Sequence, residues 1–160
     1  MVPDPFSGRV DAFYQARLGK GTLISGVSFA AFSGVPRNYI SQFAFGAQAI
    51  FLLPRGAAGR TPTVTQTDVK FAYRYELPTK RAMSMELFLD LFNIFNELTP
   101  LRVDENYTFD QVAPIVNGSV ADLKYARNSS GAPVAVNPNF GKPTAFQAPF
   151  HGRFGLRLMF

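Results

Sequence analysis

The 160-residue sequence contains no cysteine, no tryptophan and a single histidine. The absence of cysteine excludes disulfide scaffolds, thiolate metal sites and cysteine nucleophiles. The longest uninterrupted apolar run, residues 49–53, is far shorter than the roughly 20 residues of a membrane-spanning helix, so we expect no helix to cross a bilayer. The first residues also lack the basic and apolar segments of a secretory signal, so a signal for export is expected to lie elsewhere.

The sequence also lacks a cluster of like charges. The chain has 16 Lys and Arg residues against 11 Asp and Glu residues, but its basic residues are scattered, and Lys80-Arg81 is the one adjacent pair. Surfaces that follow a phosphate backbone usually gather their cations on one face or helix. We therefore do not expect nucleic acid as a partner.

Five stretches alternate between apolar and polar residues, which is the period of a β-strand. Apolar side chains occupy the odd positions of residues 65–77 and 83–91 and the even positions of residues 6–18 and 150–160, and a fifth stretch, residues 22–32, alternates more weakly. The stretches are about 10 to 13 residues long, whereas globular strands have about 5 or 6. Such lengths suit strands that cross a bilayer obliquely, which takes about 9 to 11 residues.

The connections between these stretches alternate in length. Residues 19–21 and 78–81 are short turn signals, whereas residues 33–62 and 94–149 are long. Outer-membrane barrels have short periplasmic turns and long external loops. The pattern therefore predicts an all-β fold: an antiparallel transmembrane β-barrel segment of about five long strands, forming an incomplete barrel.

Three points have a second interpretation. Residues 85–98 could form a helix with Phe88, Phe92 and Phe95 on one side, although the alternation of Asp90 favours a strand. Residues 40–53 could extend the neighbouring strands or form a packed loop. The apolar faces could pack in a soluble sandwich, but aromatic residues near strand ends favour a lipid-facing surface with interfacial girdles, for which the chain offers Phe150, Phe154, Phe160, Tyr14, Tyr73 and Tyr75.

Enzyme chemistry has little support in the sequence. His151 has no neighbour in sequence that suggests a nucleophile or a metal site. Glu86 and Asp90 lie four residues apart, which places them on one strand face about 13 Å apart, too far for the acid/base pair of a glycoside hydrolase. We expect a hydrated interior wall there, and neither a catalytic, a metal nor a cofactor site.

Four stretches resemble one family: Ser33-Gly34-Val35-Pro36; residues 54–62 (PRGAAGRTP) running into Thr67-Asp68-Val69; residues 90–96 (DLFNIFN); and residues 137–144 (NPNFGKPT). Together they resemble the C-terminal part of the barrel of TonB-dependent outer-membrane receptors, in the branch with a carboxypeptidase-regulatory-like domain at the N-terminus. The ending is similar to the terminal strand signal that the barrel-assembly machinery reads, with Phe154, Leu156, Leu158 and Phe160 as its residues.

The resemblance implies that residues 1–160 are the C-terminal part of a barrel in the bacterial outer membrane, without plug domain or TonB-binding box. The intact receptor would import a scarce ligand, such as a metal chelate or an oligomer, and this chain alone would not transport it. Residues 33–62 and 94–149 would be extracellular loops, with candidate ligand contacts at Arg37, Tyr39, Arg55, Tyr107 and Tyr125. The partners would be outer-membrane lipid, the assembly machinery and, through the absent N-terminal part, TonB.

Two other functions stay open at this point, a soluble carbohydrate-binding β-sandwich and a structural or adhesive outer-membrane barrel. The alternation also yields a pair of expectations. Leu87→Arg, on the lipid face, should impair membrane assembly by about 2 to 4 kcal/mol, whereas Glu86→Gln, on the interior face, should be mild.

Overall fold

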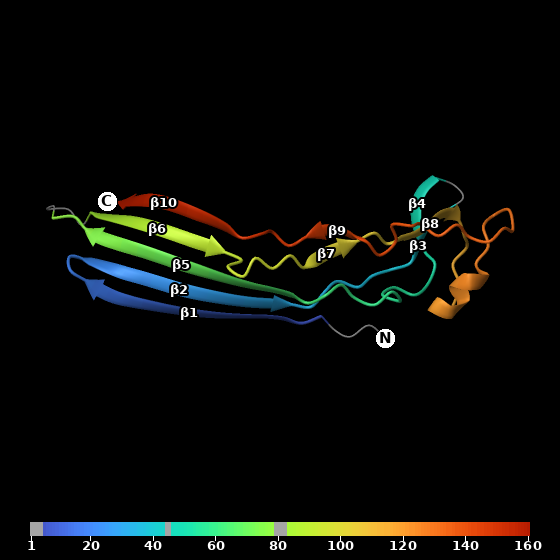
Figure 1. Ribbon diagram of the computed structural model, residues 1–160, viewed down its shortest axis with the longest axis horizontal. Coiled ribbons are helices and arrows are strands. Elements are labelled where there is room, and N and C mark those ends of the chain that lie inside the picture. Colours follow the sequence, from blue (N-terminus) through green and yellow to red (C-terminus); the bar gives the residue numbers. More distant parts are fainter. Residues whose placement is uncertain (1–4, 44–45, 79–82) are drawn as a thin grey trace. The chain divides into compact units, whose positions relative to one another are not determined.

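The computed structural model describes residues 5–43, 46–78 and 83–160, which form two compact units (Figure 1). The sheet unit comprises Ser7–Phe32, Val64–Leu98 and Gln147–Phe160. The loop unit comprises Ser33–Thr63, Thr99–Phe146 and the described residues before Ser7. Within the described ranges, no helix combines the length and apolar character needed to span a membrane.

The sheet unit is a five-stranded antiparallel sheet in the order β1-β2-β5-β6-β10. Each predicted strand agrees with the observed one to within one residue at either end, so the prediction of a mainly β fold with five long strands is confirmed. The observed bounds are β1 Ser7–Leu18, β2 Gly21–Phe32, β5 Val64–Glu76, β6 Ser84–Phe92 and β10 His151–Met159.

The tight turns also follow the sequence. Gly19, in the turn between β1 and β2, has a φ of 61°, a conformation that suits glycine. Residues 79–81 of the predicted turn at residues 78–81 lie outside the described part of the chain. On either side of it the Leu77 amide donates to the Met83 carbonyl at 2.9 Å, which closes the ladder between β5 and β6.

The helical alternative for residues 85–98 is wrong, because β6 continues to Phe92 and is followed by a turn. Asn93 and Asn96 both adopt a φ of 51°, in the left-handed region that asparagine tolerates better than most residues. The buried Asn93 side chain donates from Nδ2 to the carbonyls of Glu97 and Ala148, both at 2.8 Å, and the Asn96 side chain accepts the Phe150 amide at 2.9 Å. The DLFNIFN motif thus fastens the segment before β10 to the end of β6.

The register places the apolar positions of all five strands on one face. One cross-strand row runs Tyr14, Ser25, Phe71, Leu89, Phe154, and the next runs Ala16, Leu23, Tyr73, Leu87, Leu156. This apolar face is exposed: Phe71, Leu87 and Phe154 have relative accessibilities of 45%, 46% and 71%. The described residues of the sheet unit form one sheet, so this unit provides no second layer of the kind that a sandwich needs.

The loop unit contains two small sheets, β4-β3-β8 and β7-β9, and a 3₁₀ helix, η1. Residues 40–53 supply β3 and β4 followed by the buried pair Leu52 and Leu53, so they form a sheet with β8 and do not extend the long strands. A core of Leu52, Leu53, Val112, Leu123 and Ala126 holds the unit together. The bounds are β3 Ile40–Phe43, β4 Gly46–Phe51, β7 Pro100–Val103, β8 Asn106–Gln111, η1 Val120–Tyr125 and β9 Pro143–Phe146.

Candidate functional site

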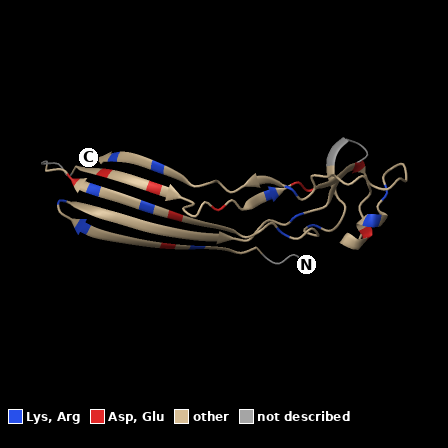
Figure 2. Cartoon of the chain, viewed as in Figure 1, with Lys and Arg blue, Asp and Glu red and all other residues tan. Residues whose placement is uncertain are grey.

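The polar face of the five-stranded sheet carries two rows of charged residues that run across the strands (Figure 2). The first, which we call the Glu86 row, consists of Arg17, Thr22, Arg74, Glu86 and Arg157, which are successive register partners from β1 to β10. The second, the Asp90 row, consists of Phe13, Gly26, Lys70, Asp90 and Arg153. Each row has a carboxylate on β6 between cations on β5 and β10.

In the Glu86 row, one carboxylate holds two arginines. Arg74 donates from Nε and Nη2 to Oε2 of Glu86, at 3.1 and 2.8 Å, and Arg157 donates from Nη1 to Oε1 at 3.3 Å. The Glu86 side chain retains 3% of its accessibility, whereas the two arginines remain about half exposed. The guanidinium groups therefore replace water around this carboxylate.

In the Asp90 row, the carboxylate pairs with one of its two neighbours. Arg153 donates from Nε and Nη2 to Oδ2 of Asp90, at 3.1 and 2.6 Å, and the Asp90 side chain is 8% accessible. The expected hydrated wall at Glu86 and Asp90 is therefore wrong for the carboxylates themselves, because arginine side chains shield both from solvent. Lys70, directly opposite Asp90, forms no ion pair or hydrogen bond within the described residues.

Phe88 separates the two rows. Its ring lies against Gly155, where an added Cβ would come within 2.4 Å of the ring, so the glycine makes room for it. The guanidinium carbons of Arg153 and Arg157 lie 5.6 and 5.7 Å from the ring centroid, within range of a cation–π interaction. Packing thus restricts the same arginines that the buried carboxylates hold.

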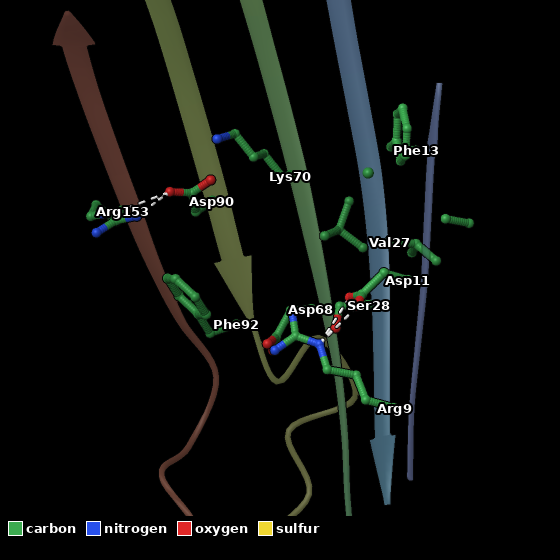
Figure 3. A pocket seen from close by; sticks show the side chains of 13 residues that line it. Arg9, Asp11, Phe13, Val27, Ser28, Asp68, Lys70, Asp90, Phe92 and Arg153 are labelled. Atoms are coloured by element: carbon green, nitrogen blue, oxygen red, sulfur yellow. Dashed lines mark hydrogen bonds and ion pairs between the residues drawn. The ribbon is translucent and has the colours of Figure 1, made fainter. Parts of the chain in front are cut away.

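A hollow of about 340 Å³ opens beside the Asp90 row (Figure 3). Phe13 on β1 lies on one side of it, and Phe92 and Arg153 lie on the other. Its other two carboxylates also have partners: Asp11 accepts from Arg9 at 2.9 Å, and Asp68 accepts the Asn93 amide at 2.9 Å and the Gln66 side chain at 2.8 Å. The hollow can offer hydrogen bonds and aromatic surface to a ligand.

His151 belongs to the same polar face, as its place in the alternation predicted. Its ring stacks on Phe92 at a centroid distance of 4.8 Å, and Nδ1 lies 3.0 Å from the Pro149 carbonyl. The described residues contain no cluster of three or more carboxylates and histidines able to hold a metal. The polar face thus presents charged groups, hydrogen-bonding groups and aromatic rings.

Three of the five predicted ligand-contact residues stack or hydrogen-bond with other residues of the loop unit. Tyr39 and Tyr107 pack edge to face at 5.5 Å, and Phe140 stacks on Tyr39 at 5.0 Å. Burial, with a smaller contribution from Tyr39, raises the pKa of Tyr107 above its ordinary value. Arg37 donates from Nη2 to the Ala58 carbonyl at 2.7 Å.

The other two predicted residues, Arg55 and Tyr125, are exposed. The Arg55 guanidinium lies 4.6 Å from the Phe51 ring centroid, and the Lys124 ammonium lies 4.7 Å from that of Tyr125. In the part of the chain that the structure describes, neither shares a ring contact or hydrogen bond with Tyr39 or Tyr107. The structure brings together one pair of the five, Tyr39 and Tyr107.

Sequence reasoning missed the arginines Arg74, Arg153 and Arg157 as a group. The signal was present in part, because all three occupy polar positions of the alternation and Glu86 and Asp90 share the same face. Their pairing depends on the register between β5, β6 and β10. Periodicity within a single strand does not contain that register.

Comparison with known proteins shows similarity to a transporter. No family model matches the chain, and no solved structure matches it. The TonB-dependent transporter Oar of Myxococcus xanthus is 36% identical over 149 residues, which cover 84% of this chain and 14% of that protein. Because this relative is a transporter, the match is consistent with the expectation that the chain is not an enzyme. The chain is homologous to a region of a TonB-dependent transporter and spans about a seventh of the length of that relative.

Proposed function

We propose that this chain forms the C-terminal barrel portion of a TonB-dependent transporter in the bacterial outer membrane. Its five long strands would be neighbouring strands of the barrel wall, and the loop unit would lie outside the cell. The intact protein would import a scarce ligand, with TonB acting through parts that lie outside this chain. The 160 residues would not transport by themselves.

The observation that carries this proposal is the single apolar face that the register builds across five strands. Phe71, Leu89 and Phe154 lie side by side on it, at exposures that a protein in water seldom gives to a contiguous apolar surface. The opposite face carries the ion-paired rows. In outer-membrane barrels, residues alternate between lipid and a polar interior in this way.

The unpaired edges of the sheet also support this proposal. β1 and β10 are each paired on one side in the described sheet, so a row of backbone amides and carbonyls is left open at either edge. Unpaired backbone groups in a bilayer cost several kcal/mol each, and the smallest single-chain barrels have about eight strands. Further strands of a longer protein would satisfy both edges and close the wall.

The other two candidate functions have less support. A soluble carbohydrate-binding sandwich needs a second sheet over the apolar face, and the described part of the sheet unit supplies one sheet. A structural or adhesive barrel would share the proposed wall. The relation to a TonB-dependent transporter favours transport.

The proposal is tested by placing one arginine on either face of the sheet in the full-length protein. Leu87→Arg puts the charge on the apolar face, and Gln15→Arg puts it one cross-strand row away on the polar face. Near the bilayer midplane, a lipid-facing arginine costs about 2 to 4 kcal/mol, so we expect Leu87→Arg to reduce assembled barrel in outer membranes and Gln15→Arg to leave it unchanged. Heat-modifiable migration on gels measures assembly. Equal effects of the two variants would refute the assignment of the faces.

A further inference from the structure

The Glu86 row contains two pairs of arginines that lie two strands apart. A carboxylate lies between the arginines of one pair, and none lies between those of the other. Arg74 and Arg157 lie two strands apart, and Glu86, on the strand between them, bridges both. Arg17 and Arg74 also lie two strands apart, and the residue between them is Thr22. Neighbouring strands are about 4.8 Å apart, so each pair of arginines spans about 10 Å along the row.

The open half has unused hydrogen-bonding capacity. Arg17 and the Thr22 hydroxyl have no hydrogen-bond or ion-pair partner among the described residues. Arg74 uses Nε and Nη2 on Glu86, which leaves Nη1 available. A guanidinium has five N–H donors in a planar fork that fits the two oxygens of a carboxylate.

Charge favours an anion at this position. The row has three arginines against one carboxylate, and that carboxylate already accepts three hydrogen bonds. Toward the turns, Lys20 and Glu76 are opposite in sign, and the Lys20 carbonyl accepts the Glu76 amide. The row therefore keeps a positive excess that no described residue of the sheet unit neutralises.

We propose that a carboxylate from outside this chain binds over Thr22 between Arg17 and Arg74, in the manner of Glu86 between Arg74 and Arg157. The group would accept from both guanidiniums and from the threonine hydroxyl. It would complete a row in which cations and anions alternate across the sheet. The site depends on the polar face alone and not on a membrane location. The carboxylate belongs either to a soluble ligand or to an acidic side chain elsewhere in a longer protein.

The direct test is titration of the full 160-residue chain with sodium acetate at constant ionic strength. The chain carries ¹⁵N-arginine and is held in a non-ionic maltoside detergent, which has no competing phosphate. We expect the Nε–H resonances of Arg17 and Arg74 to shift together and to saturate. Arg17→Gln should weaken acetate binding about tenfold, since a charge-assisted pair is lost, whereas Arg9→Gln, whose partner is Asp11, should change it little.

A substitution at Thr22 tests the position itself. Thr22→Glu supplies the missing carboxylate from within the chain, so it should abolish acetate binding as Glu86 does for the other half of the row. Thr22→Gln introduces a side chain of the same size as that of Thr22→Glu but without charge, so it should retain acetate binding within about threefold. Saturable binding that survives Thr22→Glu, or arginine resonances that acetate does not move, would overturn the proposal.

A second readout uses the full-length protein in native membranes and does not require the isolated chain to fold. The chain has no cysteine, so Thr22→Cys adds a single thiol to it. Between two arginines, this thiol should react at least about tenfold faster with a sulfonate-bearing thiosulfonate than with a trimethylammonium-bearing one, and Arg17→Gln should reduce that preference. Equal rates with both reagents would refute the site. If added acetate protects the thiol from reaction, the carboxylate belongs to a soluble ligand. If the thiol reacts only after mild urea, the carboxylate belongs to an acidic side chain of the longer protein that occupies the site.

Discussion

At the scale of single residues, Glu86 shows how much a side chain's role depends on its neighbours across the sheet. On its own strand it is one polar residue in an alternating series. Across the sheet it lies between Arg74 and Arg157 and accepts hydrogen bonds from both. The expectation that Glu86→Gln would be mild therefore needs revision.

We predict that Glu86→Gln destabilises the sheet by about 2 kcal/mol, because hydrogen bonds between charged groups are lost and two arginines face each other without a counter-ion. Urea unfolding in detergent measures the change. Glu76→Gln is the matched control on the same face of the sheet, since Glu76 is exposed, and it should stay within about 0.5 kcal/mol. A Glu86→Gln variant as stable as the control would show that the buried carboxylate contributes nothing.

The alternation predicted which residues lie on the polar face, but it did not predict the ion-paired rows. The alternation assigned Arg74, Glu86 and Arg157 to the polar face correctly. It did not show that they form one row, because the partner of a residue is set by strand register, and register depends on turns and on pairs far apart in sequence. The ligand contacts at Tyr39 and Tyr107 stay a prediction. An aromatic residue in a long connection has the same sequence signature whether it meets a ligand or another ring, and these two rings pack on each other.

At the scale of elements, Asn93 ends β6 and fixes the approach to β10. Its side chain makes three hydrogen bonds with the backbone, to Glu97 twice and to Ala148 once, at 2.8 to 3.0 Å. Its backbone is left-handed. Asparagine meets both demands, which gives the DLFNIFN motif a physical reason.

We predict that Asn93→Ala destabilises the sheet unit by about 3 kcal/mol, from lost hydrogen bonds and from the left-handed backbone. Asn93→Gly keeps the backbone conformation and should recover about 1 kcal/mol of this loss. Asn117, also left-handed at φ 55° but without a side-chain hydrogen bond among the described residues, is the control, and Asn117→Ala should cost about 1 kcal/mol. Chemical unfolding of the three variants distinguishes the two contributions.

The carboxylate of Asp104 makes the stability of the loop unit depend on pH. Its carboxylate accepts hydrogen bonds from the Asn106 amide at 2.9 Å and from the Asn137 side chain at 3.0 Å. These bonds lower the pKa of Asp104 below its ordinary value of 3.8, and the bond from the Asn106 amide contributes most. A lowered folded-state pKa contributes stability above pH 3.8 that is lost as the pH falls through the folded-state value.

We therefore expect amide hydrogen exchange at Asn106 and Asn137 to accelerate below pH 4, after correction for intrinsic rates. Asp104→Asn removes the titrating group and should flatten this dependence. Asp122, whose pKa is also lowered, chiefly by the Ser119 amide, contributes with the same sign at η1 and remains as an internal comparison. Identical pH profiles for the native chain and Asp104→Asn would contradict the prediction.

Long elements were predictable and short ones were not. Each of the five long strands repeats its two-residue period often enough to be read from the sequence. β3 and β7 have four residues each, too few for a period to register, and tertiary contacts hold them. Ile40, for example, donates to the Glu105 carbonyl at 3.0 Å, and the Asn38 amide donates to the Glu105 side chain at 2.9 Å, contacts that no local pattern specifies.

At the scale of the whole molecule, the proposed barrel depends on assembly. β10 is an edge strand of the described sheet, with Phe154, Leu156 and Leu158 exposed on its apolar side. We predict that deleting Phe160 in the full-length protein lowers insertion by the barrel-assembly machinery, whereas Phe160→Tyr, which keeps an aromatic ring, does not. The fraction of protein that resists urea extraction from outer membranes measures insertion. Normal insertion without Phe160 would remove it from the assembly signal.

The positions of Glu86 and Asp90 also disfavour wrong registers between β5 and β6. Sliding β6 along β5 by two residues keeps every side chain on its own face, so hydrophobicity alone does not oppose it. In one direction, however, such a slide sets Asp90 against Asp68, and in the other it sets Glu86 against Glu76. Like charges directly opposite one another are destabilising. The same carboxylates that bind the arginines thus destabilise both nearest wrong registers, so the native pairing of β5 with β6 is favoured over its two neighbours.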